Sequence, residues 1–182
     1  MGQLSVFVFI TLDGYYKGLN EDISWHKHGP EESEFSEENL RSGNILLFGR
    51  KTYDMMAQFW PTPIAQELYP IVAEGMNKSE KIVFSKNLQK ADWQNTRIIN
   101  ENIFDEIRKL KQAGRDMTLL GSGNLLNQLA EEGLIDSYQI MADPVAIGAG
   151  TPLFKNIKSH LDLKLTSTRT FKNGEVLLNY KR

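Results

Sequence analysis

Apolar residues occur along this chain in two patterns. Short runs of mainly apolar residues, many of them β-branched or aromatic, predict strands that are covered on both faces. The first run, LSVFVFITL at 4–12, contains few polar residues and should lie in the centre of a sheet. The other predicted strands are 44–49, 81–85, 97–99, 117–121, 137–148, 163–171 and 175–181.

Between these runs, apolar residues recur at helical spacing. The predicted helices are 29–43, 51–60, 65–76, 103–114 and 124–133. Proline and glycine residues mark several of their limits, because proline cannot continue a helix and glycine commonly follows one. Pro61 stops the second helix, Gly114 ends the fourth, and Pro70 predicts a kink within the third.

The order of these elements predicts the fold class. Strands and helices alternate up to residue 133, and three strands follow, the last two joined by the turn signal Lys172-Asn173-Gly174. No repeat, linker or low-complexity segment divides the chain. We therefore predict a single α/β domain over 1–182, with helices flanking a central mixed, mostly parallel sheet and with antiparallel strands at the C-terminal end.

Composition narrows the possible functions. The chain has 182 residues, a formal net charge of -2 and no cysteine, so thiolate metal sites and cysteine nucleophiles are excluded. An acidic balance without runs of Lys or Arg argues against a nucleic-acid partner. The N-terminal segment has neither the basic residues nor the length of a signal peptide or membrane helix. We expect a cytoplasmic enzyme or binding domain that does not interact with membranes.

Three strand-to-helix junctions carry residues suited to bind anions. Gly49-Arg50-Lys51-Thr52 follows the second strand, Ser85-Lys86 the third, and Gly121-Ser122-Gly123 the strand at 117–121. Glycines let backbone N–H groups approach a pyrophosphate, and a helix N-terminus adds partial positive charge. Each junction also has a structural alternative: a solvated helix start, an ordinary strand exit, and a tight turn, since Leu126 leaves the G-x-G-x-x-G pattern incomplete.

Four stretches in sequence order resemble one known group of proteins. They are FITLDG, LLFGRKTY, IVFSKN and LLGSGNLLNQLAEEGLIDSYQIMADPVAIGAGTPLF, and together they cover most of the chain. The sequence resembles the dihydrofolate reductase-like superfamily, most closely the C-terminal reductase domain of bacterial riboflavin-biosynthesis deaminase-reductases. The resemblance implies that the chain binds NADPH.

The cofactor-binding residues that this resemblance implies fall on the three junctions. Gly49, Arg50, Lys51 and Thr52 should lie near the phosphates, Ser85 and Lys86 near the adenosine 2'-phosphate, and Gly121, Ser122, Gly123, Asn124 and Leu125 around the pyrophosphate. Two cationic sites favour the phosphorylated cofactor over NADH, which lacks that extra charge.

Two carboxylates are candidate catalytic residues. Asp13 follows the first strand and should lie near the nicotinamide, although an Asp-Gly turn is an equal alternative. Glu31 belongs to a second set, with Trp25, Pro30, Glu32 and Phe35, that resembles the substrate-binding residues of folate reductases. The position of Phe35 favours Glu31 over Glu32 as the carboxylate that pairs with a pterin ring. A solvated acidic helix face is the alternative.

The substrate is less well defined than the cofactor. No arginine occurs between Arg50 and Arg97, whereas folate reductases use one there to bind the glutamate carboxylate, and lysine is a poor replacement. The riboflavin-type reductase matches better, although its deaminase partner domain is absent. Three functions stay open: an NADPH-dependent reductase of a C=N bond in a pyrimidine- or pterin-like substrate, similar to 5-amino-6-(5-phosphoribosylamino)uracil reductase; a folate reductase; and a non-catalytic nucleotide-binding domain.

Further residues complete the hypothesis. Tyr53, Met56 and Trp60 lie on one face of the helix at 51–60 and, with Trp25, could line a substrate pocket, although core packing is the alternative. His26 and His28 have no third ligand near them in the sequence, so we expect no metal site. We expect a homodimer, because the segment 163–171 alternates like an edge strand and the related reductases are commonly dimers.

Overall fold

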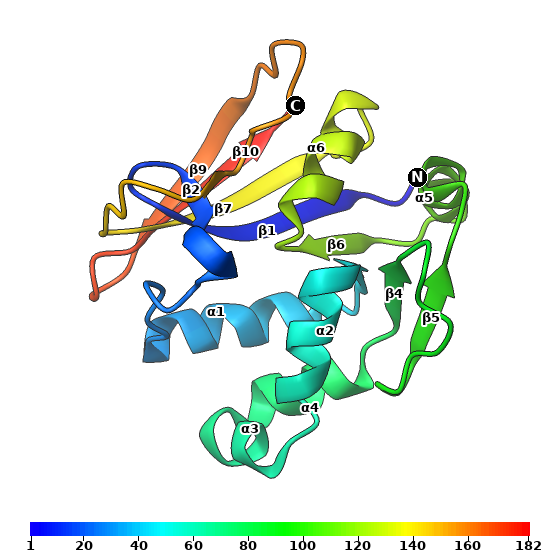
Figure 1. The fold of residues 1–182 in the computed structure, drawn as a ribbon, viewed down its shortest axis with the longest axis horizontal. Helices are drawn as coiled ribbons and strands as arrows, with labels where there is room; N and C mark the ends of the chain where they lie inside the picture. Colours follow the sequence, from blue (N-terminus) through cyan, green and yellow to red (C-terminus); the bar gives the residue numbers. More distant parts are fainter.

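The computed structural model describes residues 1–182 and contains one large sheet with helices on both faces (Figure 1). The sheet has eight strands in the order β5-β4-β3-β6-β1-β7-β10-β9. Their bounds are β1 Leu4–Thr11, β3 Ile45–Gly49, β4 Lys81–Phe84, β5 Thr96–Ile99, β6 Met117–Leu120, β7 Ser137–Asp143, β9 Lys164–Thr170 and β10 Val176–Lys181. A separate short pair joins β2 Tyr15–Lys17 to β8 Thr151–Pro152.

The strand directions confirm the predicted sheet. β1 lies between β6 and β7 and runs parallel to both, and β3 is parallel to β4 and β6. Only β10 runs in the opposite direction to the other strands, so it is antiparallel to both of its neighbours, β7 and β9. The sheet is therefore mixed and mostly parallel, with antiparallel C-terminal strands, and the apolar run at 4–12 does form its centre.

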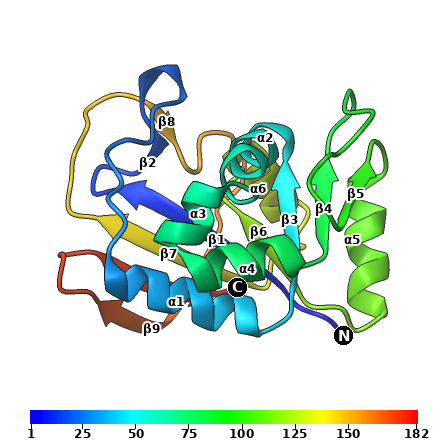
Figure 2. The same cartoon turned by 90° about the horizontal axis from the view of Figure 1, so that it is seen from below.

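The helices divide into two layers. They are α1 Pro30–Arg41, α2 Arg50–Phe59, α3 Pro63–Leu68, α4 Pro70–Lys78, α5 Ile103–Gln112 and α6 Gly123–Glu131, with a short 3-10 turn η1 at Leu19–Glu21. Helices α1 to α4 cover one face of the sheet, with α1 against α4 (Figure 2), and α6 covers the other (Figure 1). No helix combines the length and apolar composition that a membrane span requires.

Alternate residues of each central strand enter the two layers. Leu4, Val6 and Val8 of β1 pack in the cluster that also contains residues of α5 and α6, whereas Phe7 packs against Phe35 of α1. All of these side chains are buried. Burying a side chain of this size stabilises the fold by roughly 1.5–3 kcal/mol, so the continuous apolar runs follow from a sheet that is covered on both faces.

Three details differ from the prediction. The segment 65–76 is not one kinked helix: Tyr69 has φ −138 and ψ 61, and Pro70 begins a new helix, α4. The strand predicted at 137–148 ends at Asp143, before Pro144. The β2–β8 pair was not predicted, because its strands are too short to show any period in the sequence.

The topology places the three predicted junctions side by side. β4, β3 and β6 are neighbouring parallel strands, so their C-terminal ends meet at the same edge of the sheet. The C-terminal ends of β1 and β7 continue this edge. Open α/β sheets bind their ligands at the carboxyl ends of such strands.

Candidate active site

The β3–α2 and β6–α6 junctions contact each other directly. The Ser122 hydroxyl accepts a hydrogen bond from the Gly49 N–H at 2.9 Å and donates one to the Leu120 carbonyl at 3.0 Å. Gly121 and Ser122 both have left-handed backbone conformations, with φ of 55° and 56°. Ser122 therefore links two neighbouring turns into one rigid unit.

The backbone at the first turn of α6 is open to close contact with another group. The Ser122 side chain forms no capping hydrogen bond with α6, so the first N–H groups of this helix lack the partner that an N-cap usually gives. A Cβ on Gly123 would lie 2.5 Å from Cζ of Tyr16, so a larger residue there would displace the Tyr16 ring. Gly123 and Asn124 thus begin a helix whose N-terminus can hold an anion, while the Leu125 side chain is buried in the core.

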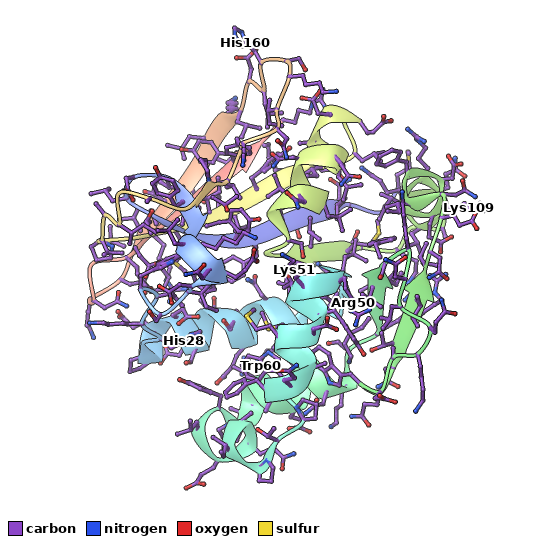
Figure 3. The ribbon with its side chains drawn as sticks, in the orientation of Figure 1. His28, Arg50, Lys51, Trp60, Lys109 and His160 are labelled. Carbon is purple, nitrogen blue, oxygen red and sulfur yellow. The ribbon has the colours of Figure 1, made fainter.

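The cations of the β3–α2 junction already have partners within the chain. The Arg50 guanidinium binds Asp54 one turn further on, with Nε 2.6 Å from Oδ2, and Lys51 Nζ lies 3.1 Å from Oε1 of Glu21. Lys17 binds the other oxygen of Glu21 at 2.6 Å. Figure 3 shows Arg50 and Lys51 at the start of α2. An anion that bound Lys51 would therefore compete with Glu21.

The third junction has one free cation. The Ser85 hydroxyl accepts from the Leu88 N–H at 3.1 Å and so stabilises the turn after β4, which supports the strand-exit alternative for this residue. Lys86 is exposed and forms no ion pair. Thr52, on α2, lies against Gly121, its Cγ2 3.6 Å from where a Cβ of that glycine would be.

A buried polar cluster lies at the ends of β1 and β7. It consists of His26, His28, Glu32, Asp143 and Glu175, from the loop before α1, the first turn of α1, the end of β7 and the residue before β10. His26 Nδ1 is 2.9 Å from Asp143 Oδ1, and His28 Nδ1 is 2.8 Å from Glu32 Oε2. The His26 ring stacks on Phe9 of β1, with centroids 3.8 Å apart.

The charges of this cluster are strongly coupled. Burial opposes the charged form of His26, but its hydrogen bond with Asp143 and the nearby charges of Asp143 and Glu32 raise its pKa to about 9. Burial likewise opposes ionisation of Glu32, but His26 and His28 lower its pKa to about 2. Burial raises the pKa of Glu175, and the neighbouring Asp143 charge adds to this effect. These pKa shifts favour a charged His26 beside the carboxylates of Asp143 and Glu32 when no other cation is bound.

The two predicted catalytic carboxylates lie outside the cluster. Asp13 accepts hydrogen bonds from the Thr11 hydroxyl at 2.6 Å and the Gly148 N–H at 2.7 Å, which lower its pKa; these contacts support the turn-residue alternative over a proton donor. Glu31 accepts from the Lys172 N–H at 2.7 Å, at the β9–β10 turn. Of the two neighbouring carboxylates it is Glu32 that is buried, at 3% exposure.

The predicted pocket residues separate into two groups. Tyr53 is buried against Phe48 and Trp93, and its hydroxyl accepts from the Trp93 N–H at 3.3 Å; it belongs to the core and does not line a pocket. Trp60 donates its indole N–H to Met56 Sδ at 3.0 Å. An aromatic row leads from Trp60 through Tyr69 to His28 of the cluster, with centroids 6.2 and 5.8 Å apart.

Trp25 lies at the other side of this cluster. Its ring centroid is 6.2 Å from that of His26, and its indole N–H donates to the Asp22 carbonyl at 3.2 Å. Two surface hollows of about 400 Å³ lie elsewhere, beside α4 and along 154–163. The candidate site is therefore an open edge of the sheet, with glycine-containing turns after β3 and β6 and an acid–histidine cluster beside the ends of β1 and β7.

The chain matches one known family of proteins over nearly its full length. The family model of the RibD C-terminal domain matches residues 3–177, nearly the whole chain. The chain belongs to the RibD C-terminal domain family. Among curated relatives, the Bacillus subtilis (strain 168) protein YyaP is 34% identical, in an alignment that covers 94% of this chain and 90% of YyaP. The protein YwjB of the same organism is 25% identical, in an alignment that covers 97% of this chain and 96% of YwjB. Both are uncharacterized.

Solved structures show the same RibD-type fold. A protein from Shewanella sp. PV-4 that is named for riboflavin biosynthesis superposes with a TM-score of 0.79 at 22% identity, covering 99% of this chain and 98% of its own. A pyrimidine reductase-like protein from Corynebacterium diphtheriae superposes with a TM-score of 0.64 at 13% identity, and the match covers 99% of this chain and 91% of that protein. The bifunctional deaminase/reductase of Thermotoga maritima gives 0.69 at 13% identity over 99% of this chain, which spans 56% of that protein.

Proposed function

We propose that this RibD-type domain is an NADPH-dependent reductase that transfers a hydride to a C=N bond of a pyrimidine- or pterin-like substrate. The observation that carries the proposal is the continuous sheet edge. The linked turns with Gly49 and Ser122 lie at the ends of β3 and β6, and the buried cluster lies at the ends of the next strands, β1 and β7. A dinucleotide lying along this edge would reach from the turns to the cluster.

The cofactor end is formed by backbone groups and one free lysine. The first N–H groups of α6, at Gly123 and Asn124, would bind the pyrophosphate, because they lack a capping side chain and carry the positive end of the helix dipole. Lys86 would bind the 2'-phosphate, since it forms no internal ion pair. NADPH supplies the hydride when bound.

The substrate end would be the buried cluster. A heterocycle with ring nitrogens and amino groups offers several N–H donors, and the carboxylates of Glu32 and Glu175 can accept them. Trp25 and the row from His28 to Trp60 provide flat apolar surfaces beside these acceptors. We therefore assign substrate contact to Glu32 in place of Glu31. The names of the Thermotoga and Corynebacterium structures support a pyrimidine substrate.

The experiment is an assay of NADPH oxidation, followed by absorbance, with phosphoribosylaminopyrimidines, pterins and dihydrofolate as acceptors. We expect turnover of a pyrimidine or pterin and its loss in Glu32→Gln. Glu31→Gln is the matched control, because it removes a carboxylate one position away that faces the β9–β10 turn, and it should keep full activity. Turnover of dihydrofolate alone would identify a folate reductase. NADPH binding without turnover of any acceptor would indicate a non-catalytic nucleotide-binding domain.

A further inference from the structure

The buried cluster contains a nitrogen atom that lacks a partner. His26 Nε2 is buried and forms no hydrogen bond, although its side chain is only 7% exposed. The nearest acidic atom is Oε2 of Glu32, 3.6 Å away. Buried polar atoms normally have hydrogen-bond partners, so an atom left without one points to something that binds between these side chains.

The other nitrogen of the same ring is firmly held. His26 Nδ1 contacts both oxygens of Asp143, at 2.9 and 3.2 Å. When Nδ1–H donates to this carboxylate, the lone pair of Nε2 points toward Glu32 and His28. Histidines that bind metals usually donate their second N–H to a carboxylate in this way, which fixes the tautomer and the ring orientation.

The ligand atoms are close enough to share one ion. His28 Nδ1 is 2.8 Å from Glu32 Oε2, and the ligand atoms of His26, His28 and Glu32 all lie within 4.8 Å of one another. In a tetrahedral zinc site with bonds of about 2.0–2.2 Å, ligand atoms are roughly 3.3 Å apart, and 2.8 and 3.6 Å lie on either side of this value. Glu32 thus provides the third ligand that the sequence did not reveal.

The charge of the cluster also favours a cation. Glu32, Asp143 and Glu175 are all buried, at 3% exposure or less. Their only ion-pair partners are His26 and His28, and one oxygen of Glu175 is also buried without a hydrogen-bond partner. Buried carboxylates are normally paired with a cation or coordinated to a metal.

We propose that His26, His28 and Glu32 bind a divalent transition-metal ion, with Asp143 as the residue that orients His26. Imidazole nitrogens favour zinc and similar ions over magnesium or calcium, which prefer oxygen ligands alone. The side chain of His28 is half exposed, so the ion would stay accessible from outside. Glu32 is also the proposed substrate contact, so the ion and the substrate would share this carboxylate, but Zn²⁺ binding is measured without the reductase reaction.

The test is isothermal titration of the full chain with Zn²⁺, after treatment with a chelator and its removal. We expect one Zn²⁺ per chain, and binding about 10- to 100-fold weaker in Asp143→Asn, as for other orienting residues. His28→Ala and Glu32→Gln should weaken binding at least as much. His160→Ala and Glu31→Gln are the controls and should bind as the wild type does, since His160 is exposed and lies far from α1 (Figure 3).

Two results would overturn the proposal. One is the absence of saturable Zn²⁺ binding to the wild-type chain. The other is binding by His28→Ala and Glu32→Gln that is as tight as in the wild type. Far-UV circular dichroism tests whether each variant is folded. His28→Ala changes a half-exposed side chain, so it should disturb the core least. Titration with Co²⁺, read by visible absorption, reports separately on the geometry of the ligands.

Discussion

The protonation of His26 should make the stability of the metal-free protein depend on pH. In the folded chain its pKa is raised to about 9 from the usual value of 6.5, with Asp143 and Glu32 outweighing the effect of burial. A pKa raised by folding stabilises the folded state fully below the unfolded value, and this stabilisation is lost as the pH rises through the folded value. The stabilisation by His26 is therefore lost between about pH 6.5 and about pH 9.

The size of the effect follows from the same shift. A pKa difference of this size corresponds to about 3 kcal/mol of unfolding free energy, lost at up to about 1.4 kcal/mol per pH unit. Solvent screening reduces this only slightly, because the His26 side chain is 7% exposed. The contribution belongs to the coupled cluster as a whole, so the Glu32 shift is not added to it.

Urea unfolding of chelator-treated protein measures this directly. The free energy of unfolding is compared between about pH 5.5 and about pH 9.5 for the wild type, His26→Asn and the surface control His160→Asn. Titrating groups outside the cluster contribute equally to all three proteins. We expect the advantage of the wild type over His26→Asn to shrink by about 3 kcal/mol across this range. If the wild-type and His26→Asn curves run parallel, the assignment of a buried imidazolium is refuted.

Three further predictions concern the turns and the assembly. Ser122→Ala should lower the unfolding free energy by about 1–3 kcal/mol, measured by urea denaturation, because the Gly49 N–H loses its acceptor; an unchanged value would show that this link is not needed. Glu21→Gln should strengthen NADPH binding by roughly two- to fivefold, measured by fluorescence titration, because Lys51 loses its competing carboxylate; weaker binding would show that Glu21 helps the site. We propose a homodimer that involves the exposed strand β9, and light scattering after size exclusion should give twice the chain mass, whereas a monomer mass excludes it.

The fold could be predicted because its strands are covered on both faces. The continuous apolar runs of β1 and β3 are typical of parallel strands that pack against helices on both faces of the sheet. The prolines and glycines between these runs mark most of the limits of the helices and strands. Pro70 was misjudged because proline is as well suited to begin a helix as to kink one. Nothing in the sequence decides between these two outcomes.

The positions of the three strand-to-helix junctions could also be predicted, because each junction is local in sequence. The partners of their cations could not. Lys51 binds Glu21, thirty positions earlier, and this contact depends on how the loop between β2 and α1 folds back onto α2. The sequence therefore indicated the cations of this junction but not the carboxylate that pairs with one of them.

The buried cluster was missed because it is assembled from distant segments. His26 and Asp143 are 117 positions apart, and no spacing rule connects them. The choice between Glu31 and Glu32 depends on the rotation of α1, where one residue corresponds to about 100°. One signal was available: Asp143 directly precedes Pro144 at the end of an apolar strand, and a carboxylate at that position falls at the ligand-binding edge of a parallel sheet.

The most direct test of the reductase assignment is a titration of the chain with NADPH and with NADH, followed by nicotinamide fluorescence. The account predicts that NADPH binds roughly tenfold tighter or better, and that Lys86→Ala removes this difference. Lys90→Ala, which changes a lysine already paired with Asp92 on the same loop, should leave the difference intact. If neither dinucleotide binds, or if Lys86→Ala binds both as the wild type does, the proposed cofactor site is contradicted.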